Sequence, residues 1–148
     1  MRFTRSTLTF AALAGVLVAT PSALVTPAVA FPDATPQGVC GRGYATVNSM
    51  PVGSLGTVYL TYNSSNGQNC VATIRNKPGR AVDMSVWIDV PDTGNAAQDY
   101  GQYTSHAGPA YVYGKGHCVN WGGHIDNRYV QVYNSNCALR EHRVTFTR

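Results

Sequence analysis

Histidines, serines and carboxylates are the residues of this chain that could carry out nucleophilic or acid–base chemistry. A hydrolase needs a nucleophile beside a base, with a third group that orients the base. No serine stands in a Gly-x-Ser-x-Gly turn, the usual setting of a serine nucleophile. The best remaining combination is His106 or His124 with Asp99, which would suit a cell-wall hydrolase. We expect no catalytic residues and keep the hydrolase as the last of three hypotheses.

Two further chemistries need their residues closer together than this sequence places them. Asp83 and Asp89 share one face of a predicted strand, and six extended residues set them about 20 Å apart. The carboxyl pair of a glycosidase is separated by only about 5–9.5 Å. His117 and His124 are seven residues apart, so on a strand they would point to opposite faces, away from a shared metal ion. We therefore expect no paired-carboxylate glycosidase, no metal site and no cofactor.

The cysteines are better explained as two disulfides. They are Cys40, Cys70, Cys118 and Cys137, an even number in a small domain that we expect to be exported. Three pairings are open, and one local argument favours Cys118 with Cys137. Ile125–Arg128 resembles a two-residue hairpin turn, and in that register Cys118 faces Ser135, with Cys137 diagonally across. Cys40 then pairs with Cys70 by elimination, and each bond should stabilise the domain by about 2–4 kcal/mol.

Aromatic side chains are the remaining group with binding chemistry. The chain has nine tyrosines and two tryptophans, accompanied by asparagine and glutamine more than by charges. Flat rings edged by hydroxyl and amide groups suit a neutral polysaccharide or a protein partner. About half of the rings should fill the core, and Trp121 is expected there. The candidates for ligand contact are Trp87 first, followed by Tyr59, Tyr129 and Tyr133.

Short strands must position these residues. Val82–Val90 alternates apolar with polar side chains, which places one face in a core and Trp87 on the solvent face. Other strand-like runs are 57–62, 70–75, 100–104, 110–113, 118–125 and 129–133, separated by turn-forming residues. No convincing helix is present. The pattern predicts an all-β fold, a single antiparallel sandwich or barrel of about 7–8 short strands.

The first thirty residues predict export. Arg2 and Arg5 precede the apolar run Leu8–Val18, and Ala28–Ala30 forms a small-residue cleavage site. Removing both arginines lowers the formal net charge from +4 to near +2. The predicted organisation is a signal peptide over 1–30, an extended lead-in over 31–39, an all-β domain over 40–137 and a basic tail over 138–148.

The predicted compartment and charge also limit the partners. The body of the domain holds no lysine and arginine cluster of the kind that phosphate binding requires, so we expect no nucleic acid. After signal cleavage we expect no membrane attachment either. A neutral polysaccharide such as a cell-wall polymer, or a secreted protein, remains as the expected partner.

Six motifs are distributed along the predicted domain. They are Cys-Gly-x-Gly-Tyr at 40–44, Gly-Thr-Val-Tyr-Leu-Thr-Tyr-Asn at 56–63, Asn-Gly-x-Asn-Cys-Val at 66–71, Thr-Ile-Arg-Asn at 73–76, Tyr-Thr-Ser-His-Ala-Gly-Pro-Ala-Tyr-Val-Tyr at 103–113 and Gly-His-Cys-Val-Asn-Trp-Gly-Gly-His-Ile-Asp-Asn at 116–127. Together these motifs resemble the spore-associated protein A family. The resemblance runs from Cys40 to Cys137 and departs from the family's pattern at the basic tail. It implies a small exported protein of spore-forming filamentous bacteria and their relatives, associated with the spore surface. The family supplies no catalytic residue to transfer.

Three functions follow from these observations. The leading hypothesis is a secreted, non-enzymatic protein of the spore or cell surface that binds wall polysaccharide through exposed aromatic rings. The second is a secreted inhibitor or toxin-like domain that presents a loop, 63–69 or 92–98, to a protein partner. The third is the cell-wall hydrolase.

Overall fold

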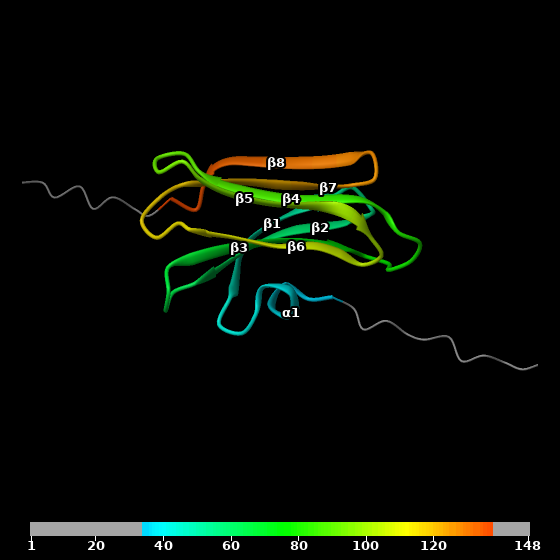
Figure 1. Ribbon diagram of the computed structural model, residues 1–148, viewed down its shortest axis with the longest axis horizontal. Coiled ribbons are helices and arrows are strands. Elements are labelled where there is room, and N and C mark those ends of the chain that lie inside the picture. The colour runs from blue at the N-terminus through cyan, green and yellow to red at the C-terminus, as the bar shows by residue number, and fades with distance from the viewer. Residues whose placement is uncertain (1–33, 138–148) are drawn as a thin grey trace, which may run out of the picture. The chain divides into compact units, whose positions relative to one another are not determined.

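The computed structural model describes residues 34–137, which form a sandwich of two four-stranded antiparallel sheets (Figure 1). The strands are β1 (Ala45–Val52), β2 (Gly56–Asn63), β3 (Gln68–Arg75), β4 (Val82–Val90), β5 (Asn95–Tyr103), β6 (His106–Tyr113), β7 (Val119–Ile125) and β8 (Arg128–Ser135). One sheet has the order β1-β2-β3-β6 and the other β5-β4-β7-β8. The predicted all-β antiparallel fold is confirmed, and the two separate sheets make it a sandwich.

The core lies between the two sheets and consists mainly of branched apolar side chains. On β4 the predicted alternation is confirmed, since Met84, Val86 and Ile88 are buried while the residues between them face outward. Trp121 on β7 is fully buried, as predicted, and its indole N–H donates to the Ser135 hydroxyl at 2.8 Å. That bond satisfies the polar atom which a buried tryptophan brings into the core.

A short helix, α1 (Pro36–Cys40), takes the place of extended chain over residues 36–39 of the lead-in predicted for 31–39. The Thr35 side chain accepts a hydrogen bond from the Gly38 N–H at 3.0 Å, and Pro36 occupies the first turn. Both features favour a helix start, because the cap pairs a free N–H and proline already holds a helical φ. Five residues carry too little periodicity to be recognised in the sequence.

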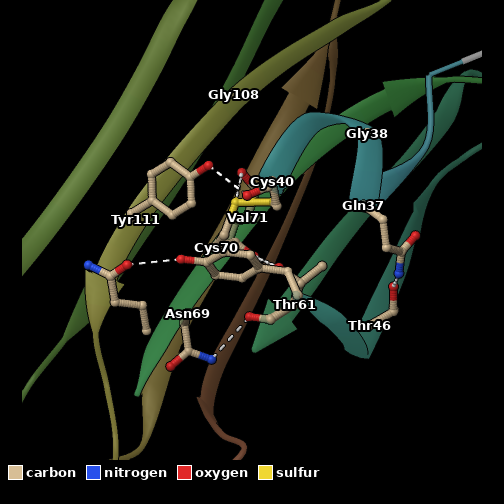
Figure 2. The surroundings of a disulfide bond; sticks show 12 residues. Gln37, Gly38, Cys40, Thr46, Thr61, Asn69, Cys70, Val71, Gly108 and Tyr111 are labelled. Atoms are coloured by element: carbon tan, nitrogen blue, oxygen red, sulfur yellow. Dashed lines mark hydrogen bonds between the residues drawn. A yellow bond between two sulfur atoms is a disulfide. The ribbon is translucent and has the colours of Figure 1, made fainter. Parts of the chain in front are cut away.

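The Cys40–Cys70 disulfide fastens α1 to the outer face of β3, as Figure 2 shows. Around it a second apolar cluster forms, made of Cys40, Tyr44, Cys70, Ala72 and Ile74. The Tyr111 hydroxyl donates to the Cys40 carbonyl at 2.7 Å (Figure 2), and burial, with a contribution from Tyr44, raises the pKa of Tyr111. The helix is therefore part of the fold and covers part of one outer face of the sandwich.

The second disulfide joins Cys118 to Cys137, so both predicted pairings are confirmed. The predicted facing of Cys118 and Ser135 is wrong by one residue, because Val119 faces Ser135. The register is regular from the Ile125 and Arg128 pair to Trp121 and then shifts at a bulge, where Asn134 adopts a positive φ of 48°. A bulge adds one residue to one strand, and the hairpin turn gives no sign of it.

Both predicted loops, 63–69 and 92–98, are shorter than predicted, because β3 begins at Gln68 and β5 begins at Asn95. The turn at 63–67 is present, and the Asn63 side chain accepts from the Ser65 N–H at 3.0 Å. The predicted signal peptide, residues 1–30, and the basic tail, residues 138–148, lie outside the described residues.

Candidate functional site

Cross-strand register brings the outward side chains of the β5-β4-β7-β8 sheet into rows. Trp87 on β4 pairs with Gln98 on β5 and with Gly122 on β7, and Gly122 pairs in turn with Gln131 on β8. Paired residues of an antiparallel sheet share a face, so the two glutamine amides flank Trp87 on the solvent side. The outward position predicted for Trp87 is confirmed.

Two consecutive glycines on β7 explain how the sheet accommodates a tryptophan on its surface. A Cβ at Gly122 would come within 2.9 Å of the Trp87 ring, so the ring lies against bare backbone. Gly123 points to the opposite face, where a Cβ would collide with the Thr73 hydroxyl in the core. The Trp87 ring also lies 6.2 Å from the ring of Tyr133, centroid to centroid, which is ordinary aromatic contact.

A second row lies about 7 Å along the strands from the first. It runs Tyr100, Ser85, His124 and Tyr129 across the four strands. The rings of Tyr100 and His124 are 5.8 Å apart, and Ser85 Oγ and His124 Nδ1 share a hydrogen bond of 2.6 Å. We call Trp87, Tyr100, Tyr129 and Tyr133 together the aromatic face.

The aromatic face is open to solvent. Tyr129 is 74% exposed, Tyr100 66% and Tyr133 58%, whereas Trp87 is half-buried. Two shallow depressions flank the Trp87 ring, one of about 530 Å³ reaching to Asp89 and one of about 420 Å³ reaching to Tyr100. Exposed rings gathered over shallow hollows mark a surface suited to binding.

The carboxylates on this face are held by neutral donors. The Gln102 side-chain amide donates to Asp83, and the Tyr100 hydroxyl reaches the same oxygen at 3.4 Å. The Asn120 amide donates to Asp89 at 3.0 Å. The face therefore combines rings, amides and hydroxyls with two carboxylates that already accept hydrogen bonds from neutral donors, and its rings, amides and hydroxyls suit a hydroxyl-rich ligand.

The sequence candidates for ligand contact do not all meet here. Trp87, Tyr129 and Tyr133 lie on one surface, but Tyr59 is on the outer side of the other sheet, packed against the cluster beneath α1. Tyr59 is therefore not part of the aromatic face. Tyr100 belongs to it and was not among the sequence candidates, although it begins a run predicted as a strand. Tyr100 alternates along β5 in step with Gln98 and Gln102, and this period of two could have placed it on the solvent face.

Asp99 and His124, one of the two histidines considered with it for hydrolysis, lie on opposite faces of their sheet. Asp99 accepts from the Tyr103 hydroxyl and from the Gly108 N–H, both at 2.7 Å, on the β6 side of the sheet. The hydrogen bond from Tyr103 to Asp99, with burial, raises the pKa of Tyr103. His124 lies on the opposite face, where it is hydrogen-bonded to Ser85. A serine and a histidine could act as nucleophile and base, but within residues 34–137 no carboxylate is hydrogen-bonded to this histidine to orient it. His106 is hydrogen-bonded to its neighbour Ser105.

Within residues 34–137, His, Cys, Asp and Glu side chains nowhere gather in the group of three that would hold a metal ion. The same range contains no helix with the length and apolar character needed to cross a membrane.

Comparison with known proteins shows one clear relationship. The chain is 50% identical over 124 residues to spore-associated protein A of Streptomyces coelicolor, and the alignment covers 84% of this chain and 79% of that protein. Models of known protein families give no match. Solved structures give none either.

Proposed function

Because this chain belongs to the spore-associated protein A family, we propose that it is a secreted, non-enzymatic protein held at the spore or cell surface by wall polysaccharide bound to its aromatic face. The relative is named for its association with spores. The predicted signal peptide supports export to the outside of the cell. Two disulfides suit an oxidising compartment.

The observation that carries the binding proposal is the gathering of four rings on one exposed sheet face. Tyr100 and Tyr129 lie three strands apart, so the face spans about 14 Å across the sheet. A surface of that width, without a deep pocket, suits an extended polymer better than a single small molecule. Rings stack on the apolar faces of sugars, while amides such as that of Gln98 bond their hydroxyl groups.

Co-sedimentation tests this proposal. The oxidised domain is mixed with purified cell wall, chitin, cellulose or intact spores at low and high salt, and the pelleted fraction is measured. We expect saturable pelleting with one polymer that persists at high salt, because stacking does not depend on charge. Pelleting that salt abolishes, or no pelleting at all, would contradict the proposal.

Matched variants locate the contact. Trp87→Ala and Tyr129→Ala should each weaken pelleting about tenfold or more, as for a buried aromatic anchor. Tyr113→Ala removes an exposed ring from the other sheet and should leave pelleting unchanged. Tyr129 is the most exposed ring of the face, so its loss should preserve folding even if Trp87→Ala does not. Equal binding by the Tyr129 and Tyr113 variants would remove the aromatic face from the proposal.

A further inference from the structure

A sandwich of two sheets has four edge strands, and three of these are protected against pairing with another chain. β1 contains Pro51 and a bulge, both of which interrupt a ladder. β6 contains Pro109 and a register shift. β5 packs beside β6, and the hydrogen bond from the Gly108 N–H to Asp99 joins the two edges.

The fourth edge strand, β8, has none of these protections along most of its length. Over Arg128–Ser135 it contains no proline, glycine or lysine, and its one charged residue is Arg128 at its start. Its pairing with β7 is regular from Arg128 to Val132, and within residues 34–137 β7 is the strand it pairs with. A regular, β-prone strand with an unpaired edge is a template for another strand.

The middle of β8 also has a sequence that is the same in both directions. Residues 129–133 are Tyr-Val-Gln-Val-Tyr, a palindrome centred on Gln131. Two-fold symmetry requires one patch to complement itself, and antiparallel pairing of a palindrome does so residue by residue. We propose that β8 pairs with β8 of a second copy of this chain, about a two-fold axis at Gln131.

The side chains fit this pairing on both faces of the sheet. Tyr129 would face Tyr133 of the second copy on the solvent side, and half-buried Val130 would face Val132 of the second copy on the core side. Aromatic and β-branched pairs of this kind stabilise neighbouring strands. Arg128 would face the second copy's Asn134, so the one charge on the strand does not meet its like.

The pairing also joins the two aromatic faces into one. Two four-stranded sheets become a continuous sheet of eight strands, with Tyr129 and Tyr133 of each copy at the junction. Five paired residues form a small contact, below the about 1,200 Å² typical of stable complexes, so the dimer should be weak and favoured at high local concentration. A surface polymer that binds both faces would supply that concentration.

Sedimentation velocity of the oxidised domain tests the pairing without any ligand, so its outcome is independent of polysaccharide binding. From about 10 µM to about 1 mM we expect a reversible shift from monomer to dimer. Gln131→Lys and Gln131→Glu each place like charges on the two-fold axis and should weaken the dimer about fivefold or more at low salt. Gln131 is exposed, so both variants should fold, which thermal unfolding checks.

Mixing the two charged variants gives the decisive measurement. Lysine then faces glutamate across the axis, so the mixture should dimerise more strongly than either variant alone. Gln98→Lys makes the same change on the same face at the opposite edge and should leave dimerisation unchanged. A monomer throughout the series, a dimer insensitive to both charges, or a mixture that stays monomeric would each overturn the proposal.

Discussion

The two disulfides close loops of similar length but lie in different surroundings. Removing each one separately measures how much those surroundings add to its effect on the free energy of unfolding. The sequence separations are 30 residues for Cys40–Cys70 and 19 for Cys118–Cys137. Loop-closure entropy assigns them about 3.6 and about 3.2 kcal/mol of stability. From chain entropy alone, the double variants C40A/C70A and C118A/C137A should therefore differ by only about 0.4 kcal/mol.

Packing should separate the two variants further. Cys40 and Cys70 are buried within the second apolar cluster, whereas Cys137 is exposed. A five-residue helix is not stable without tertiary contacts. Once released, α1 would uncover Ile74 and loosen the hydrogen bond from Tyr111 to the Cys40 carbonyl. The lost burial and hydrogen bond should add about 1–3 kcal/mol to the cost of C40A/C70A.

Urea unfolding of both variants checks this expectation. The free energy of unfolding should fall more for C40A/C70A, and amide exchange should accelerate at residues 36–44 in that variant alone. The total stability of a domain of this size is about 5–15 kcal/mol, so C40A/C70A should approach the limit of folding. Losses equal within about 0.5 kcal/mol, or a larger loss for C118A/C137A, would refute the argument from packing.

Two further substitutions test single contacts. Tyr103→Phe removes the hydrogen bond to Asp99 and should cost about 1 kcal/mol at neutral pH. The pKa of Tyr103 is raised in the folded state, so the contribution of Tyr103 to stability is present below pH 10 and is lost as the pH rises through the raised pKa. The variant should therefore lose stability less steeply in alkali than the wild type. Equal slopes of unfolding free energy against pH, measured in urea, would contradict this. Gly122→Ala puts a methyl group against the Val130 carbonyl and the Trp87 ring, and should cost about 1–3 kcal/mol and change tryptophan fluorescence. Gly79→Ala, whose Cβ would have its nearest neighbour at 3.8 Å, is the matched control and should be close to neutral; similar losses for both alanines would show that the ring does not need Gly122.

Local patterns were enough to predict most of the fold. The period of two in β4 gave its buried face, and the turn at Ile125–Arg128 led to the correct disulfide partner for Cys118. Such features depend on residues close together in the chain. The helix α1 escaped prediction because its stability comes from a cap and from a bond to Cys70, thirty residues away.

The composition of the aromatic face depended on pairing that no local pattern contains. Trp87 lies over Gly122 because β4 pairs with β7, two strands that are not consecutive in the chain. Gly122 and Gly123 follow Trp121 in the chain, but the ring that lies against Gly122 belongs to Trp87. Tyr59 has the same outward alternation as Trp87, yet it faces away on the other sheet. Alternation assigns a residue to a face of its own strand and leaves open which sheet that strand joins.

Tyrosines are packed on one outer face of the sandwich and exposed on the other, and this contrast bears on function. Beneath α1, the hydroxyls of Tyr44 and Tyr111 bond to Gln68 and to the Cys40 carbonyl, and their rings lie 5.5 Å apart beside a disulfide. On the other face, Tyr129 contributes little to packing, since it is 74% exposed. Stability therefore accounts for the first set of rings and not for the second. A substitution of Tyr129 should accordingly reduce polymer binding with little effect on unfolding, whereas one beneath α1 should do the reverse.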